Sequence, residues 1–404
     1  MRRPSGALIR LLQLHPMWMG AMRVMEVGQR GSGAAGQEAS GAAPEQRTAQ
    51  QIELPDLLCE PLPSRPASPL PVLDTRARGT RFIQLSVRSV LNTPASTHMG
   101  FWSINPYVGC EFGCTYCYAR DTHRWVVERL GSEASLLRRP AAPLPPWEAF
   151  EKEILVKSGV AEVLGRTLKP ARVAGQSLVI GTATDPYQPA ERRFRLTRRI
   201  LEVLRSYHGL SIEIITKSPL VTRDLDLLQA LSQQNEVNVN ISLATADPRL
   251  ARRLELRSPV PGARLRALRR LTEGGVYAGL IVAPIIPGIT DDWAGLARLM
   301  EAAKEAGARY VIGSALRLGP AARRRFLPVL EREFPALYQR YRRHYAGSDM
   351  VSRSYQDALT RRLNALRQAY GFAGDEASKR RRQRLEAAEH SGKVVEAAEQ
   401  SVLL

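Results

Sequence analysis

Cysteine is rare in this sequence, and long apolar runs are missing from it. Only four cysteines occur in 404 residues, and three of them lie at positions 110, 114 and 117. This argues against the disulfide framework of a small secreted protein, which has many cysteines along a short chain. No run of about 18 uncharged apolar residues occurs, so we expect no membrane-spanning helix and no membrane partner. Both absences predict a cytoplasmic protein.

Lysine is scarce as well, although the chain is strongly basic. Seven of its 58 basic residues are lysine, so arginine carries most of a formal net charge of +19. A basic surface attracts nucleic acid by releasing counterions from phosphates, which makes a nucleic-acid partner one interpretation. The other is compositional, because a GC-rich genome would enrich arginine without selection for phosphate contacts. The sequence leaves both interpretations open.

Composition divides the chain into three parts. Residues 1–75 are rich in glycine, alanine and proline and show no sustained apolar period, which predicts a disordered extension. Residues 80–372 carry the apolar patterns of a folded core with C-terminal helices. Residues 373–404 start with a basic run and continue as a charged segment, which predicts a solvated tail or a lone surface helix.

Short β-branched runs alternate with amphipathic stretches in the central part. The runs that predict strands lie at 101–109, 177–184, 211–218, 236–245, 276–288 and 309–319. The stretches that predict helices lie at 191–209, 224–235, 261–275 and 291–308. This alternation indicates an α/β fold with a parallel sheet. Six units are too few for a closed eight-stranded barrel, so we predict a partial (β/α)6 TIM-like barrel with functional residues after the strand ends.

Three cysteines follow the first predicted strand with the spacing C-x3-C-x2-C. They are Cys110, Cys114 and Cys117, and Gly109 and Gly113 allow tight turns between them. Such a loop is typical of metal binding. Four thiolates would complete a 4Fe-4S cluster, so three leave one iron open to bind a substrate or cofactor.

Other interpretations of this loop remain. A structural zinc ion would need a second ligand pair, which the sequence does not offer at the usual spacing. A redox dithiol would use Cys114 and Cys117 but leave Cys110 without a role. Cys59, in the Pro-rich extension, is either a fourth ligand or an unpaired thiol.

The loop and its surroundings resemble a known family. The cysteine spacing, with Tyr116 before the last cysteine, is similar to the signature of the radical S-adenosylmethionine (SAM) enzymes. The segments "INPYVGCEFGCTYCYAR", "TDPYQPAE", "ITKS", "ISLAT" and "APIIPGITD" together resemble the spore photoproduct lyase-like group of that superfamily. The resemblance runs from about residue 100 to 290 and extends more faintly to residue 372.

The resemblance implies the chemistry of the site. The three cysteines would hold a 4Fe-4S cluster whose open iron chelates SAM. One electron from the reduced cluster would cleave SAM to methionine and a 5'-deoxyadenosyl radical, which takes a hydrogen atom from a substrate. The cluster and cofactor carry this chemistry, while the protein supplies placement and electrostatics. A reductant such as a flavodoxin or ferredoxin is then the expected partner.

Polar residues at the predicted strand ends are the expected SAM contacts. Thr182, Thr184 and Asp185 follow the second strand, where the family binds the methionyl amino group, although the same residues suit a turn before a helix. Lys217 and Ser242 end the next two strands, and the resemblance implies that they contact the carboxylate and ribose of SAM. A solvated strand end is the alternative for a lone lysine.

The resemblance assigns further residues. Tyr116 and Arg257 are expected near SAM, with Glu255 and Arg264 in the same segment as Arg257; a basic helix face is the alternative for the arginines. Ile286 lies in an apolar strand whose shape suits packing against adenine. No catalytic side chain is assigned. The remaining candidates are Tyr187 and Gln188 for the substrate and His123 and Trp125 for the surroundings of the cluster.

The substrate is left open. Spore photoproduct lyases reverse a thymine dimer, and the basic charge is compatible with a DNA duplex from which the lesion is flipped. Those lyases use a further cysteine C-terminal to the cluster motif, whereas this chain has none after Cys117. We therefore predict a radical SAM enzyme of unassigned substrate, with thymine-dimer lyase as one alternative. The other is a non-catalytic nucleic-acid-binding protein with a structural cluster.

Overall fold

The computed structural model describes residues 71–76, 79–97, 100–129 and 144–372. Residues 1–70 of the predicted extension, including Cys59, and the whole predicted tail at 373–404 lie outside the described residues. Strand β1 (Val72–Thr75) occupies the end of the predicted extension. Folded structure therefore begins ahead of the predicted boundary at residue 80.

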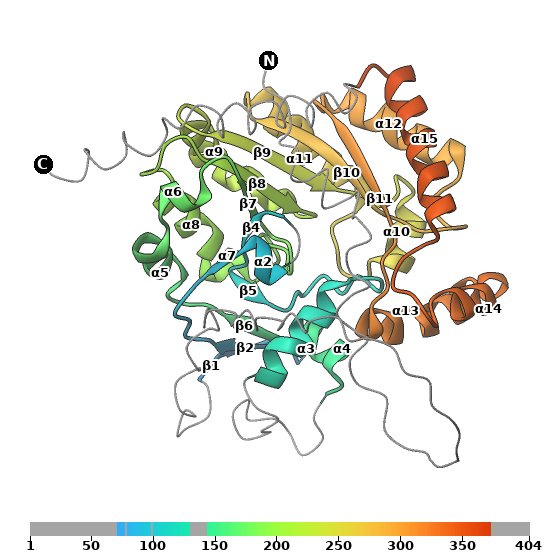
Figure 1. Cartoon of the computed structure of the whole chain (residues 1–404), viewed down its shortest axis with the longest axis horizontal. Helices are drawn as coiled ribbons and strands as arrows, with labels where there is room; N and C mark the ends of the chain where they lie inside the picture. Colours follow the sequence, from blue (N-terminus) through green and yellow to red (C-terminus); the bar gives the residue numbers. More distant parts are fainter. Residues whose placement is uncertain (1–70, 77–78, 98–99, 130–143, 373–404) are drawn as a thin grey trace, which may run out of the picture. The chain divides into compact units, whose positions relative to one another are not determined.

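Seven strands form the main sheet, in the order β11-β10-β9-β8-β7-β4-β3. Their bounds are β3 (Leu91–Asn92), β4 (Trp102–Ile104), β7 (Ser177–Ile180), β8 (Ser211–Thr216), β9 (Glu236–Ser242), β10 (Tyr277–Ile285) and β11 (Val311–Ala315). The strands from β4 to β11 pair in parallel in chain order, and β3 pairs antiparallel with β4 at the edge. Each predicted strand region contains one of these parallel strands, which confirms the α/β fold (Figure 1).

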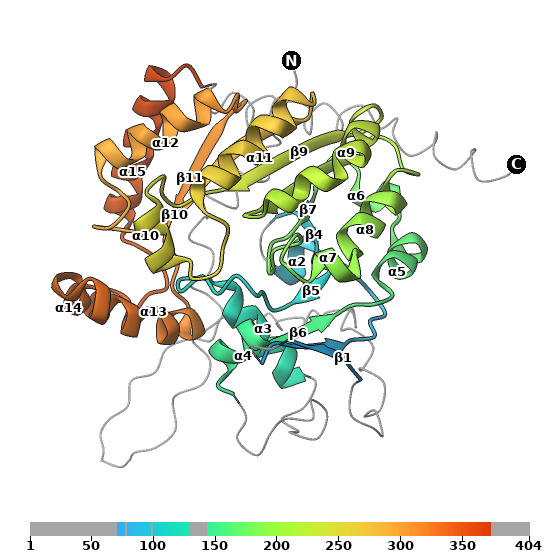
Figure 2. The same ribbon diagram turned by 180° about the vertical axis from the view of Figure 1, so that it is seen from behind.

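The parallel strands are buried because helices cover the sheet. In β8, four of the six residues of "SIEIIT" are apolar, β-branched or both, and four of the six are buried, as expected where both faces of a parallel sheet are covered. Figure 2 shows α8, α9 and α11 lying in front of the strands, on the face that is turned away in Figure 1. The linking helices are α7 (Glu191–Phe194), α8 (Leu196–Leu204), α9 (Leu225–Ser232), α11 (Pro261–Glu273) and α12 (Trp293–Glu305). They fall within the four predicted helical stretches.

A second sheet was not predicted. Its four strands have the order β1-β2-β6-β5, with β2 at Arg81–Gln84, β5 at Tyr107–Val108 and β6 at Glu153–Val156. The region 101–109, expected as one strand, is divided between β4 and β5, which belong to different sheets. Pro106 stands between them, and proline lacks the backbone N–H that a continuous ladder needs. The cysteine loop therefore leaves the second sheet and not the main one.

The remaining helices complete the described part of the chain. They are α2 (Pro94–Thr97), α3 (Ala119–Arg129), α4 (Pro146–Lys152), α5 (Val160–Thr167), α6 (Pro170–Val173), the 3-10 helix η2 (Pro219–Asp224), α10 (Pro248–Leu254), α13 (Pro320–Glu333), α14 (Pro335–His344) and α15 (Arg353–Ala369). One apolar core lies around the main sheet, and another joins the cysteine loop to α13 and α14. Among the described residues, no helix has the length and apolar character needed to cross a membrane.

Candidate metal and cofactor site

Three free thiols lie on the loop between β5 and α3. Cys110 and Cys114 are buried and Cys117 is half-buried. Burial raises the pKa of all three, that of Cys114 to about 12. Charge on Cys114 and Cys117 would further raise the pKa of Cys110, and charge on Cys117 would raise that of Cys114. Metal ligation requires thiolates, and bound iron would offset their mutual repulsion in addition to Arg120 and Lys217, whose charges lower the pKa of Cys117. The chemistry of this donor set therefore fits an iron-sulfur cluster.

The thiols do not converge on one point. Within the described ranges of the chain, no three His, Cys, Asp or Glu side chains lie close enough to share a single metal ion. A 4Fe-4S cluster makes a different demand on its ligands, because it offers a separate iron atom to each thiolate.

The backbone of the loop is fixed from the side of β7. Gly109 has φ +94, which bears out the predicted tight turn. Its carbonyl accepts hydrogen bonds from the Thr184 hydroxyl at 2.6 Å and from the Gln188 amide at 3.1 Å. The Gln188 side-chain oxygen in turn accepts from the Glu111 N–H at 2.9 Å. Gln188, expected to face the substrate, is instead fully buried and holds the loop.

The other side of the loop pairs with a segment more than a hundred residues away. Cys114 forms an antiparallel bridge with Glu255, and the Arg257 N–H donates to the Phe112 carbonyl at 3.0 Å. The hydroxyl of Ser258 lies 3.4 Å from the Cys114 sulfur. The segment after α10 thus forms the back wall of the loop.

Three arginines meet at one buried carboxylate beneath the loop. Glu151 accepts from Arg120, from Arg325 at 3.1 Å and from Arg257 at 2.6 Å. Burial alone would raise the pKa of Glu151, but the three guanidinium groups outweigh it and lower the pKa to about 2. Arg120 also donates to the Cys114 carbonyl at 2.7 Å. Arg257, expected as a SAM contact, is committed to this network through both Glu151 and the Glu111 carbonyl.

Stability should therefore depend on the charge of Glu151. Its depressed pKa means that the carboxylate stabilises the fold above its usual pKa of 4.5, and that this contribution is lost as the pH falls toward 2. We expect Glu151→Gln to lower the free energy of unfolding by about 3 kcal/mol at pH 7, and by about 1 kcal/mol less at pH 3.5. Urea denaturation at both pH values measures the difference. Glu148→Gln, on the same helix but more exposed, should change the free energy of unfolding by less than about 0.5 kcal/mol. A loss of stability in Glu151→Gln that does not vary with pH would contradict the prediction.

Gly113 is the second tight turn of the loop. It has φ +64, and an added Cβ would lie 2.5 Å from Arg257 Nη2 and 2.9 Å from Glu151 Oε2. The left-handed backbone costs alanine about 1 kcal/mol, and displacing this ion pair adds to it, so Gly113→Ala should lower the free energy of unfolding by about 2–4 kcal/mol. Urea denaturation tests this against Gly209→Ala, because Gly209 has φ +73 and no atom within 4 Å of its added Cβ. Equal losses in the two variants would mean that the contact with Arg257 contributes nothing.

Polar side chains meet at the ends of β8 and β9, as predicted. The Lys217 ammonium donates to the Ser242 hydroxyl at 2.8 Å. Asp185, after β7, accepts from the Thr216 hydroxyl at 2.6 Å and from the Lys217 N–H at 2.7 Å. The predicted turn role of Asp185 is also present, because its carboxylate accepts from the Tyr187 N–H at 2.9 Å. The structure thus brings Asp185, Lys217 and Ser242 together.

A buried carboxylate links this group to the cysteine loop. Glu255 accepts hydrogen bonds from the Tyr116 phenol and from Arg264, and lies 4.0 Å from the Lys217 ammonium. Burial opposes the charge of Glu255, but Arg264 and Lys217 outweigh this effect and lower its pKa. Arg264 is 1% exposed and also donates to the Ser242 carbonyl at 3.0 Å. The alternative of a solvated basic helix face is therefore wrong for Arg264.

The other predicted residues have mixed positions. Thr182 is buried and accepts from the Asn105 amide at 3.0 Å. Ile286 is fully buried in the apolar core that contains Cys110 and Cys114. His123 is buried against the Phe150 ring and lies 3.3 Å from the Glu153 carbonyl, which indicates a structural role. The side chain of Trp125 lies outside the described residues.

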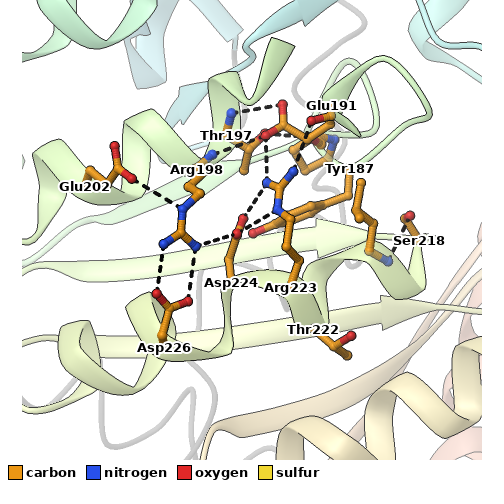
Figure 3. A network of polar contacts seen from close by, with 12 residues as sticks. Tyr187, Glu191, Thr197, Arg198, Glu202, Ser218, Thr222, Arg223, Asp224 and Asp226 are labelled. Atoms are coloured by element: carbon orange, nitrogen blue, oxygen red, sulfur yellow. Dashed lines mark hydrogen bonds and ion pairs between the residues drawn. The ribbon is translucent and has the colours of Figure 1, made fainter. Parts of the chain in front are cut away.

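Tyr187 is fully buried in a charged network beneath the loop after β7 (Figure 3). Arg223 donates to Glu191 at 3.0 Å and to Asp224 at 2.7 Å, and its guanidinium carbon lies 5.9 Å from the centre of the Tyr187 ring. Arg198 joins Asp224 at 2.9 Å. The network ties α7 and α8 to η2 and so supports the loop that carries Asp185. Tyr187 is part of this support, which corrects its expected place facing the substrate.

Sequence reasoning missed Glu151, Asn105 and the holding role of Gln188. Asn105 donates to Thr182 and accepts from the Ala183 N–H at 2.8 Å. The only signal for these residues is a polar type inside an apolar run, and it does not identify the partner. Their roles depend on hydrogen bonds to residues far away in the sequence.

Comparison with known proteins adds a family to this geometry. Residues 104–300 match the model of the Radical SAM superfamily. An uncharacterized protein of Mycobacterium tuberculosis is 33% identical over 299 residues, covering 74% of this chain and 83% of that protein. An uncharacterized protein of Methanocaldococcus jannaschii is 29% identical over 209 residues, covering 52% of this chain and 69% of that protein.

A similar fold occurs among solved structures. It is spore photoproduct lyase complexed with dinucleoside spore photoproduct, which covers 72% of this chain and 79% of its own with a TM-score of 0.51. Its sequence identity is 15%, so the likeness concerns the fold alone.

Proposed function

Because this chain belongs to the radical SAM superfamily, we propose that it is an enzyme that holds a 4Fe-4S cluster on Cys110, Cys114 and Cys117 and binds SAM beside it. The observation that carries the proposal is the set of three free thiols on one glycine-bounded loop, inside the region that matches the family. When bound, the reduced cluster supplies the electron that splits SAM into methionine and a 5'-deoxyadenosyl radical, which takes hydrogen from an unassigned substrate.

The chain's own residues would orient SAM through charge. Lys217 donates to Ser242 and lies near Glu255. Its ammonium is placed to donate a further hydrogen bond to a carboxylate, such as the carboxylate of the methionyl group of SAM. Asp185 Oδ2 accepts a hydrogen bond from the Lys217 N–H, and because a carboxylate oxygen can accept two, it has capacity for an ammonium donor. A zwitterionic cofactor therefore fits between Asp185 and Lys217. We assign Tyr116 and Arg264 to positioning, because both act on Glu255.

We also propose that the six parallel strands form a partial (β/α)6 barrel. Their uninterrupted chain order and helical connections support this arrangement. In it, the ends of β7, β8 and β9 face the cysteine loop, which agrees with the bonds that Thr184, Gln188 and Asp185 make. Functional residues would then share one end of the sheet.

The substrate stays unassigned in this proposal. Thymine-dimer repair is not favoured, because the chain has no cysteine after Cys117 to return a hydrogen atom. Nucleic acid remains a candidate on charge alone.

The test is SAM cleavage by the reconstituted protein. The protein would be loaded with iron and sulfide anaerobically, reduced with dithionite and assayed for 5'-deoxyadenosine with and without UV-irradiated, thymine-rich DNA. We expect slow formation that does not depend on DNA. A strong increase with damaged DNA would instead support repair. No 5'-deoxyadenosine from a protein with an intact cluster would overturn the proposal and leave a nucleic-acid-binding protein with a structural cluster.

A further inference from the structure

A basic hollow lies between α10 and α13, on the outside of the segment that backs the cysteine loop. Its volume is about 590 Å³, and the side chains that line it include Arg249, Arg252, Arg253, Leu256, Arg332 and Glu333. Figure 2 shows α10 directly above α13, and Arg253 joins the two helices through Glu333 at 2.7 Å. Four guanidinium groups and one carboxylate give the hollow a clear excess of positive charge.

Two of the four arginines, Arg249 and Arg252, have no acidic partner among the residues that the structure describes. Arg253 and Arg332 share Glu333, with Arg332 at 2.8 Å. Arg252 donates to the Leu256 carbonyl at 2.7 Å, which leaves its charge unbalanced. Arg249 is exposed, and its guanidinium makes no hydrogen bond or ion pair with any described residue. The hollow is therefore suited to an anionic partner from outside the chain.

A second, very narrow pocket adjoins this hollow on the side of the segment that pairs with the cysteine loop. It shares Arg252 with the hollow and is lined further by Glu255, Ser258 and Arg264. Ser258 is the residue whose hydroxyl lies 3.4 Å from the Cys114 sulfur. Leu256, in the wall of the hollow, is thus two residues from a group in contact with a cluster thiol. A partner in the hollow would stand close to the cluster while remaining outside the SAM contacts at the strand ends.

The surface around the two pockets also offers an apolar contact. Val260 lines the narrow pocket and is 43% exposed, whereas most large apolar residues in the described part of the chain are buried or half-buried. Transient electron-transfer complexes bury little surface and depend on complementary charge to steer the encounter. Basic side chains around an exposed apolar residue match that pattern.

We propose that this hollow is the docking surface for an acidic one-electron donor protein of the flavodoxin type. The inference rests on the proposed function, because only a reducible cluster needs such a donor. In the reaction, the donor is oxidised by one electron and the cluster on Cys110, Cys114 and Cys117 is reduced by the same electron, with no proton or bond exchanged. The short path through Ser258 favours transfer, since electron-transfer rates fall steeply with distance.

Charge reversal in the hollow tests the proposal. The variants are Arg249→Glu alone and Arg249→Glu with Arg252→Glu. The matched control is Arg166→Glu with Arg205→Glu, two exposed residues on α5 and at the end of α8, at the left of Figure 1 where α10 is at the right. Arg249→Glu guards against misfolding, because the Arg249 guanidinium makes no hydrogen bond or ion pair with any described residue. The readouts are the Kd of purified oxidised flavodoxin for the reconstituted protein, and the rate at which reduced flavodoxin bleaches the cluster in stopped flow.

We expect the double variant to bind flavodoxin about tenfold or more weakly and with less dependence on salt, and the single variant to show a smaller loss. Cluster reduction by flavodoxin should slow in parallel, while reduction by dithionite stays unchanged. An unchanged Kd in the double variant, or an equal loss in the control, would overturn the docking surface. Selective loss of inorganic phosphate binding, with flavodoxin binding intact, would identify a small-anion site and also overturn it. Wild-type protein that binds flavodoxin but does not cleave SAM with dithionite would refute the proposed function alone.

Discussion

Cys114→Ala is expected to reduce 5'-deoxyadenosine formation to the background rate. Cys114 is buried on the loop, it pairs with Glu255, and its sulfur lies 3.4 Å from the Ser258 hydroxyl. With two thiolates left, the cluster would lose one of its three protein ligands, and thiolate ligation is what holds it. Iron content, visible absorption and the 5'-deoxyadenosine assay measure the loss together.

Two controls separate ligation from folding. Cys114→Ser keeps a polar partner for Ser258 and should lose the cluster as the alanine variant does, with an unchanged circular dichroism spectrum. Cys59→Ala should retain full iron content and activity. If Cys59→Ala lost iron instead, Cys59 would be a fourth ligand and no iron would be open to SAM. Full activity of Cys114→Ser would remove this thiol from the site.

Arg264→Met should destabilise the protein by about 3–5 kcal/mol, because it leaves a buried charge without its partner. Arg264 and Glu255 are 1% and 2% exposed, and Arg264 also donates to the carbonyls of Pro259 and Ser242. Without Arg264, Glu255 keeps the more distant Lys217 ammonium, at 4.0 Å, as a cation beside it. The free energy of unfolding from urea denaturation gives the magnitude.

Arg266→Met is the matched control on the same helix. Arg266 is exposed, so its replacement should change the free energy of unfolding by no more than about 0.5 kcal/mol. A loss of the same size in both variants would show that the α11 helix, and not the Arg264–Glu255 pair, is responsible. A double variant, Arg264→Met with Glu255→Gln, should recover part of the loss, because it removes the unpaired charge as well.

The sequence was sufficient for those parts of the site that depend on strand order. Parallel strands in chain order bring consecutive strand ends to one edge, so Lys217 and Ser242 could be expected as neighbours. Their hydrogen bond at 2.8 Å confirms that placement. The glycines of the cysteine loop were predictable for a similar reason, because a tight turn with positive φ is the conformation that glycine adopts most readily.

The sequence could not predict which distant residues become partners in the folded protein. Glu151 lies on a seven-residue helix, and its arginines stand at positions 120, 257 and 325, which no spacing rule connects. Gln188 holds the cysteine loop because an amide can donate and accept at once, and that fit depends on two loops from different sheets. The second sheet escaped prediction because its strands have two to four residues, too few to show a period of two.

The pairing of the cysteine loop with residues 254–258 sets an order of events during synthesis. The three cysteines leave the ribosome long before Glu255 and Ser258, and contacts this distant in sequence form only after the intervening chain is present. A nascent chain that ends before α10 carries all three thiols but lacks the wall that holds them. We therefore expect cluster delivery in the cell to succeed only on chains elongated past Ser258, which makes maturation of the enzyme a late step relative to the synthesis of its cysteine loop.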